Sequence, residues 1–346
     1  MKLSDFSYEL PRSQIAQFPL ADRAASRLLI LERDTGAMRH GVFSDFASLV
    51  EPRDVVVLNT SRVIPARLRG TRKAGDGSGE RDSELLLVRE TADGTWLALG
   101  HPGGKLKPGR RVTFGGDAAA EIVEVLGGGL RRIRFVGSLD ARRTLEKYGE
   151  VPLPPYIRRP PNREDRERYQ TVYATREGSV AAPTAGLHFT PELLSGLQAR
   201  GTALARIDLH VGPGTFKPVE HDELSHHVMH AEAYEVSGES AHTINERRAR
   251  GGRIWAVGTT TVRTLETVAT PDGVVHPRSG ETALFIHPPY TFHAVDALVS
   301  NFHLPGSTLL MLVCAFGGYE RVMHAYRAAV ELGYRFYSYG DAMAIL

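Results

Sequence analysis

The alternation of hydrophobic and polar positions divides the chain into two kinds of region. In the first 65 residues and again in the second half of the chain, short apolar runs alternate with polar turns and with stretches of helical spacing. This pattern predicts strands and helices in alternation, as in α/β proteins. The predicted strands are residues 27–31, 54–59, 202–211, 253–258, 282–286, 296–304 and 334–339, and the predicted helices lie between residues 190 and 201 and at residues 259–266, 308–316 and 319–332.

Residues 66–150 follow a different pattern. Short runs with a period of two are separated by glycines, without helical spacing, at residues 84–88, 96–99, 111–114, 121–126 and 131–136. Short strands at regular intervals predict a small β-barrel or a β-sandwich. We therefore interpret the chain as an α/β domain formed by residues 1–65 and 151–346, with an all-β domain inserted at residues 66–150.

The composition is that of a globular protein able to bury a large core, with 346 residues, 42% hydrophobic and 24% charged. No run approaches the roughly 20 apolar residues of a membrane-spanning helix, and residues 1–7 lack the apolar stretch of a signal peptide. We therefore expect a cytoplasmic protein without membrane association. The single cysteine, Cys314, excludes an internal disulfide, and its apolar neighbours favour a small buried side chain.

The charge is unevenly distributed. The net charge is +2, yet residues 60–170 contain 22 Lys and Arg against 15 Asp and Glu, which favours a polyanionic partner for this part of the chain. Residues 151–160 are rich in proline and suit a stiff linker. The arginines that follow alternate with tyrosines, which also suits phosphate contact and base stacking in RNA binding. These arginines are Arg158, Arg159, Arg163, Arg166 and Arg168.

Two histidines stand at loop edges beside glycines. His210 follows a predicted strand and precedes Gly212 and Gly214, where the backbone can approach a ligand closely. His188 follows Gly186 in the same way. Such a loop also suits a tight structural turn, so the sequence alone leaves both interpretations open.

A helix start provides a second candidate site. Gly258 ends a predicted strand, and Thr259, Thr260 and Thr261 begin a helix whose free amides and hydroxyls suit an anion. Because ligands bind at the carboxyl ends of strands in α/β sheets, we expect this helix start to lie near His210.

His230 and Glu232 form a third candidate. In a strand-like segment they face the same side. Zinc requires further ligands, and neither a pair of cysteines nor an HExxH motif supplies them. We therefore expect no metal here, and we favour an acid/base or substrate-binding pair.

Several long motifs together resemble one known family, the S-adenosylmethionine:tRNA ribosyltransferase-isomerases. These motifs are LNTSRVIPAR at 58–67, VPLPPYI at 151–157, APTAGLHFT at 182–190, LHVGPGTFKPV at 209–219 and NFHLPGS at 301–307, together with residues 227–236, 255–266 and 282–316. The resemblance spans nearly the whole chain. It implies a mixed-sheet α/β domain with an inserted small all-β barrel domain.

The resemblance also implies a reaction in queuosine biosynthesis. The ribosyl part of S-adenosylmethionine is transferred and isomerised onto 7-aminomethyl-7-deazaguanine at the wobble position of tRNA, which gives epoxyqueuosine and releases adenine and methionine. S-adenosylmethionine is then a co-substrate, and no other cofactor is expected. A sulfonium acidifies its neighbouring CH₂ group, so a histidine base could start the reaction.

These implications rank the candidate residues. His210 is the first candidate for the base, followed by His188 and by His230 beside Glu232. The donor is expected at Gly212, Gly214 and Thr215 and at the helix start, and the tRNA at the arginines of residues 158–168. We expect a monomer. The alternatives are an S-adenosylmethionine-dependent RNA methyltransferase and a non-catalytic tRNA-binding protein.

Overall fold

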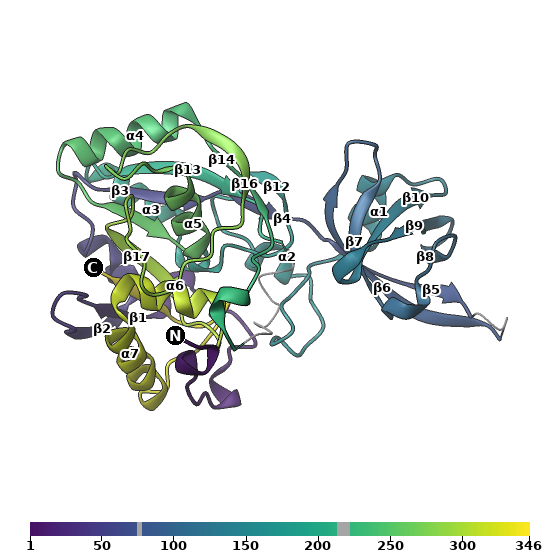
Figure 1. The fold of residues 1–346 in the computed structure, drawn as a ribbon, viewed down its shortest axis with the longest axis horizontal. Helices are drawn as coiled ribbons and strands as arrows, with labels where there is room; N and C mark the ends of the chain where they lie inside the picture. The colour runs from purple at the N-terminus through teal and green to yellow at the C-terminus, as the bar shows by residue number, and fades with distance from the viewer. Residues whose placement is uncertain (75–77, 213–221) are drawn as a thin grey trace.

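The computed structural model describes residues 1–74, 78–212 and 222–346. These residues form a mixed α/β structure with a nine-stranded sheet, a seven-stranded sheet and a two-stranded pair. Figure 1 shows two lobes, a larger one that contains the nine-stranded sheet and both termini, and a smaller one that contains the seven-stranded sheet. The α/β class predicted from the sequence is confirmed.

The nine-stranded sheet organises the larger lobe. Its strands, in the order in which they lie in the sheet, are β16 (Arg278–Thr282), β14 (Glu232–Val236), β13 (Ala203–Leu209), β3 (Val55–Asn59), β15 (Ile254–Val257), β17 (Ala297–Asn301), β18 (Ala342–Ile345), β1 (Arg27–Leu31) and β2 (Met38–Val42). The four strands β13, β3, β15 and β17 run parallel to one another. Their carboxyl ends therefore meet at one edge of the sheet, where α/β proteins bind ligands.

Helices cover both faces of this sheet. They are α3 (Pro191–Ala199), α4 (Gly238–Ala249), α5 (Thr259–Val268), α6 (Thr308–Gly317) and α7 (Tyr319–Glu331). Val55 and Val57 of β3 belong to the core that includes residues of α4, α5, α6 and α7. Val56 and Leu58 belong to the core on the other face, which includes residues of α3. This division follows from the alternation of side chains along a strand.

Side-chain caps begin two of the predicted helices. Thr190 accepts a hydrogen bond from the backbone N–H of Leu193 at the start of α3. Ser307 accepts one from the N–H of Leu310 at the start of α6. Gly201 follows α3 with φ of 97°, a conformation that favours glycine.

Two predicted strands are wrong. A strand was expected at residues 282–286, but the observed strand β16 spans Arg278–Thr282 and ends where the expected one begins. In the segment that follows, the carbonyl of Leu284 accepts a hydrogen bond from the side chain of Arg263. The strand expected at residues 334–339 is a buried aromatic segment in which Tyr337 has φ of 71°. The apolar residues there pack into the core without pairing in a sheet, and the last strand is β18.

The seven-stranded sheet of the smaller lobe is antiparallel. Its strands, in spatial order, are β11 (Gly149–Glu150), β5 (Arg67–Lys73), β6 (Glu80–Glu90), β7 (Trp96–His101), β10 (Leu130–Val136), β9 (Ala118–Val125) and β8 (Arg111–Gly115). Thr71 of β5 also pairs with Thr113 of β8, which joins six of the strands into a ring. Leu68, Leu85 and Ile133 lie in the apolar core of this lobe, and α1 (Ala141–Tyr148) contributes Leu145 to it.

A short parallel pair joins β4 (Ser61–Val63) to β12 (Arg176–Ser179). The remaining α-helix of the described chain, α2 (Asp165–Arg168), is a single turn. The 3-10 helices of the described residues are Leu3–Phe6, Arg12–Gln14, Arg23–Ala25, Phe43–Ser48, Gly103–Lys105, Gly127–Gly129, Thr184–His188 and Leu224–His226. None of the described helices combines the length and apolar character that a membrane span requires.

Candidate active site

The carboxyl edge of the parallel strands opens into a cavity of about 110 Å³, which we name the edge cavity. Thr259, Thr260 and Arg263 line it from α5, and Asn301 and His303 line it from the end of β17. The start of this helix therefore lies at a cavity on the carboxyl edge of the sheet.

A second cavity of about 540 Å³, which we name the lobe cleft, lies between the two lobes. His210, Gly178 and Glu232 line it from the larger lobe. The smaller lobe contributes Trp96, Leu97, Leu99 and Leu130, among others. Val211 lines both cavities, so the residue directly after His210 connects them.

The start of α5 presents free donors to the edge cavity. Gly258 makes the turn into the helix with φ of 88°, which a residue with a Cβ adopts only with strain. Among the described residues, the backbone N–H groups of Thr259 and Thr260 have no backbone acceptor. Thr261 is different, because its buried hydroxyl donates to the carbonyl of Val257 and it does not line the cavity. Two of the three predicted threonines therefore line the edge cavity.

A buried ion pair separates the two cavities. The guanidinium of Arg263 donates to Oε2 of Glu232, to the carbonyl of Leu284 at 3.0 Å and to that of Thr282 at 3.3 Å. Oε1 of Glu232 accepts the backbone N–H of Gly212 at 2.9 Å. The amide of Gly212, expected to face the donor, is thus bound to the protein itself.

His210 lies half-buried at the lobe cleft, with its backbone N–H bonded to the carbonyl of Ala233. Its ring packs on Gly178, where an added Cβ would come within 2.9 Å of Nδ1. Nδ1 has no hydrogen-bond partner among the described residues. Burial lowers the pKa of His210 below its ordinary value, and the charge of Arg176 acts in the same direction, while Asp208 and Glu235 oppose the shift. A neutral imidazole at the cleft suits a general base, although Nδ1 itself is enclosed against Gly178.

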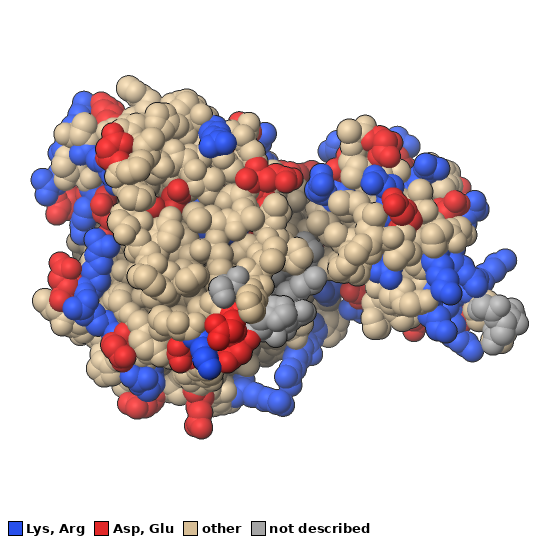
Figure 2. Space-filling view, in the orientation of Figure 1, with Lys and Arg blue, Asp and Glu red and all other residues tan. Residues whose placement is uncertain are grey.

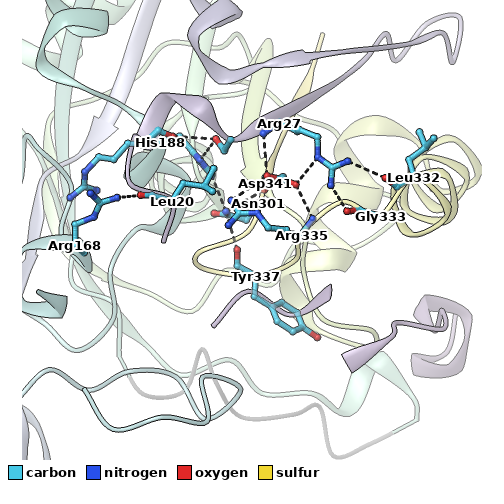
Figure 3. A network of polar contacts seen from close by, with 12 residues as sticks. Leu20, Arg27, Arg168, His188, Asn301, Leu332, Gly333, Arg335, Tyr337 and Asp341 are labelled. Carbon is cyan, nitrogen blue, oxygen red and sulfur yellow. Dashed lines mark hydrogen bonds and ion pairs between the residues drawn. The ribbon is translucent and has the colours of Figure 1, made fainter. Parts of the chain in front are cut away.

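His188 is fully enclosed and both of its ring nitrogens have partners (Figure 3). Nδ1 lies 2.7 Å from Oγ of Ser26, and Nε2 lies 3.1 Å from Nδ2 of Asn301. Since Nδ2 of Asn301 also donates to the carbonyl of Tyr337, we assign the proton of His188 to Nδ1. Burial lowers the pKa of His188 to about 4. This arrangement favours a role in holding Asn301 at the edge cavity.

His230 is exposed at the lobe cleft, two residues before β14 begins. The expectation that His230 and Glu232 share one side of a strand is wrong, since only Glu232 lies in β14. Within the described chain no hydrogen bond joins these two side chains, because Arg263 and Gly212 occupy the carboxylate. Glu232 therefore holds the site together and does not orient His230.

The five predicted tRNA-binding arginines divide into two groups. Arg159 forms an ion pair with Asp165 at 2.6 Å, Arg166 donates to the carbonyl of Gly149, and Arg168 donates to the carbonyls of Leu20 and Ala21, the first of which is drawn in Figure 3. Arg158 and Arg163 are exposed, and their guanidinium groups have no protein partner in the described part of the chain. Only these two arginines are fully available to a polyanion.

The structure does not describe two of the predicted donor-binding residues, and three residues near the edge cavity were not predicted. Gly214 and Thr215 fall outside the described residues. Asn59 and Asn301 are each the last residue of a buried parallel strand, a position that could have marked them as site residues. Arg263 lies one turn after Thr259 on α5, so helical spacing could have found it. Among the described residues no group of His, Cys, Asp and Glu is arranged to hold a metal ion.

An α/β sheet with a helix start at its carboxyl edge, beside a half-buried histidine with an unpartnered nitrogen, defines an enzyme-like site for a small charged ligand. Comparison with known proteins narrows this class. A family model described as "Queuosine biosynthesis protein" matches residues 3–345, and the chain belongs to this family.

Known relatives match over their full length. The S-adenosylmethionine:tRNA ribosyltransferase-isomerase of Moorella thermoacetica is 53% identical over 100% of both chains. The protein of the same name from Symbiobacterium thermophilum is 52% identical, also over 100% of both. The crystal structure of an S-adenosylmethionine tRNA ribosyltransferase from Thermotoga maritima is similar with a TM-score of 0.56 at 40% identity, and the match covers 99% of this chain and 100% of that one.

Proposed function

We propose that this chain is an enzyme of queuosine biosynthesis that transfers and isomerises the ribosyl part of S-adenosylmethionine onto 7-aminomethyl-7-deazaguanine at the wobble position of tRNA. The products are epoxyqueuosine in tRNA, adenine and methionine. The observation that carries this proposal is the 53% identity, over the whole length, to a protein named S-adenosylmethionine:tRNA ribosyltransferase-isomerase. The two cavities joined at Val211 agree with a reaction between two substrates.

The donor belongs in the edge cavity. The free N–H groups of Thr259 and Thr260 at the positive end of the α5 dipole suit the carboxylate of its methionine part. Gly214 and Thr215 remain predicted contacts. Gly212 supports the site through its bond to Glu232.

The acceptor base belongs in the lobe cleft. Glu177 and Glu281 line the cleft together with Trp96. Carboxylates suit the cationic aminomethyl group of the deazaguanine, and the indole ring suits a stacked base. His210 lies in the same cleft beside the shared residue Val211, where it can reach the region in which both substrates meet.

His210 is the proposed general base. Its lowered pKa favours the neutral form of the imidazole, which is the form that accepts a proton. The sulfonium of the donor acidifies its 5′-CH₂ group, and the proton taken from that carbon passes to the imidazole. His188 is second in rank, with a positioning role through Asn301.

Product analysis tests the function against its rivals. The enzyme is incubated with S-adenosylmethionine labelled in the ribose and with tRNA that carries the deazaguanine precursor. We expect label in tRNA, together with equal amounts of free adenine and methionine. Transfer of a methyl group with formation of S-adenosylhomocysteine would indicate a methyltransferase. Binding of tRNA without any product would indicate a non-catalytic protein. tRNA with an ordinary wobble guanine is the control.

The expectation that residues 66–150 are all-β is wrong, because α1 lies within them and contributes Leu145 to their core. We also propose that residues 66–150 form an inserted small β-barrel domain with this one α-helix, and that residues 1–65 and 151–346 form the catalytic domain. The ring of strands closed by the pairing of Thr71 with Thr113 supports the barrel. The separate apolar core of the smaller lobe supports the division into domains. A fragment of residues 66–150 that unfolds cooperatively would support this division, and a fragment without a cooperative transition would contradict it.

A further inference from the structure

Phe18 is the most exposed aromatic side chain among the described residues, with 58% of its surface accessible. A large apolar ring in water has an unfavourable hydration free energy, and aromatic residues are enriched where proteins bind partners. Phe18 lines neither the edge cavity nor the lobe cleft, so the donor and the reacting base leave this ring unexplained.

The ring is held in place by its neighbours. The guanidinium carbon of Arg159 lies 4.3 Å from the centroid of the Phe18 ring. Arg159 is itself fixed by two hydrogen bonds to Asp165, at 2.6 and 2.7 Å, and by one to the carbonyl of Gln17 at 2.9 Å. The exposed ring is thus presented on a rigid support, which lowers the entropy cost of binding a partner.

The same support connects Phe18 to the edge cavity. The side chain of Gln17 donates to the carbonyl of Tyr156 at 3.0 Å and accepts the backbone N–H of Arg158 at 2.7 Å. Tyr156 lines the edge cavity. A partner that rests on Phe18 therefore lies on the segment that forms one wall of the donor site.

The segment that carries Arg159 also carries two arginines whose guanidinium groups have no protein partner among the described residues. Arg158 and Arg163 are exposed, while the acidic side chains close by in the chain are Glu164, Glu167 and the paired Asp165. Figure 2 shows Lys and Arg side chains gathered along the lower edge of the molecule between its two lobes. An exposed ring, together with exposed arginines on the segment that supports it, fits a single-stranded nucleic acid, since bases stack on aromatic rings and phosphates pair with arginine.

We propose that Phe18, backed by Arg159, is a stacking platform for an unpaired tRNA nucleotide other than the reacting base, and that Arg158 and Arg163 contact the adjoining phosphates. This inference rests on the proposed function and deepens it, because it assigns a second contact between the enzyme and the anticodon region. The reacting base enters the lobe cleft. The second nucleotide, stacked on Phe18, fixes the position of the anticodon region outside the cleft.

The affinity of Phe18 variants for tRNA tests the platform. Fluorescence anisotropy gives Kd for tRNA that carries the precursor base, at several salt concentrations. We expect Phe18→Ala and the apolar variant Phe18→Leu to bind about 5- to 100-fold more weakly, and Phe18→Trp to retain the affinity of the parent. The slope of log Kd against log salt stays unchanged, because no phosphate contact is removed. Arg163→Ala, in contrast, lowers that slope.

Two controls make the result specific. A blunt RNA duplex has no unpaired base, so Phe18→Ala is expected to bind it as the parent does. Leu332→Ala removes another exposed apolar side chain, 54% accessible after the end of α7, and is expected to leave tRNA binding unchanged. Calorimetric titration with S-adenosylmethionine verifies that each variant retains the donor site.

Three results would overturn the proposal: tRNA affinity of Phe18→Ala within about twofold of the parent, an equal loss on the duplex, or a salt slope that changes as in Arg163→Ala. A parent enzyme that neither binds nor modifies tRNA would instead contradict the proposed function itself.

Discussion

Arg263 and Glu232 form a buried ion pair in which each partner lines a different cavity. Arg263 faces the edge cavity from α5, while Glu232 faces the lobe cleft from the start of β14 and also binds the N–H of Gly212. The pair therefore joins the helix that is proposed to hold the donor to the strand beside His210. Both side chains are about 5% exposed, so solvent screens their interaction very little.

Removal of one partner should destabilise the protein strongly. Glu232→Ala leaves the charge of Arg263 buried and unpaired, and we expect a loss of about 3–5 kcal/mol in the free energy of unfolding. Urea denaturation measures this loss. Glu146→Ala is the matched control, because its ion pair with Arg142 is exposed and should contribute less than about 0.5 kcal/mol. Equal effects of the two substitutions would contradict the assigned role of the buried pair.

The buried His188 should make stability depend on pH. Its pKa is about 4 in the folded protein, against about 6.5 when unfolded, so the unfolded chain binds the extra proton between these values. The free energy of unfolding should therefore fall as the pH drops from 6.5 towards 4, by about 3 kcal/mol for this group. Denaturant titrations at several pH values measure this dependence.

His188→Gln is the control for that dependence. Glutamine can keep polar contacts to Ser26 and Asn301, but it does not titrate. We expect a shallower pH dependence, with the remainder due in part to His303, whose pKa is lowered by burial to about 3. Identical pH profiles for parent and variant would contradict the assignment to His188.

Much of the fold could be predicted because local signals and global packing agree. Thr190 and Ser307 cap helices where the sequence places hydroxyls before apolar stripes, and the strand at residues 54–59 is apolar because both of its faces are buried. The segment at residues 334–339 could not be predicted in this way. Its aromatic residues fill the core as a turn, and burial leaves the same apolar pattern as a strand.

The candidate site was predictable at strand ends and less so elsewhere. His210, Thr259 and Thr260 follow parallel strands directly, and the carboxyl edge brings such positions together. The partners of charged groups depend on tertiary contacts. The hydrogen bond from Arg263 to Glu232 joins residues 31 positions apart in the sequence, and Arg159 forms an ion pair with Asp165. Neither pairing has a local signal.

A negative charge introduced at the start of α5 should stabilise the helix but weaken binding of the donor. Thr259→Asp places a carboxylate at the positive end of the helix dipole, which should favour folding, but it also repels the carboxylate of the donor. We expect the Kd for S-adenosylmethionine to rise about tenfold relative to the neutral Thr259→Asn. Calorimetric titration compares the two variants. Equal affinities would place the methionine carboxylate elsewhere.

Of the five arginines predicted to bind tRNA, Arg158 and Arg163 should make most of the contact with its phosphates. The double variant Arg158→Ala/Arg163→Ala is expected to bind tRNA more weakly and to lower the slope of log Kd against log salt by about 1.5 to 2. Binding of S-adenosylmethionine should stay the same. Arg159→Ala should reduce thermal stability, because it leaves the buried Asp165 without its ion pair, and it should also weaken tRNA binding without a change in the salt slope, because it removes the support of the Phe18 ring. An unchanged salt slope in the double variant would remove these arginines from the interface.

The loss of His210 should lower the rate of the chemical step. We expect His210→Ala to slow single-turnover ribosyl transfer by about 10²–10⁴ at saturating substrates, with nearly unchanged binding of both substrates. Because burial lowers the pKa of His210 below about 6.5, the rate of the parent should be constant above that pH and fall tenfold per unit below its pKa. His242→Ala, exposed on α4 and outside the linings of both cavities, is the control and should retain both rate and pH profile. A rate for His210→Ala within about threefold of the parent would pass the role of base to His188 or His230.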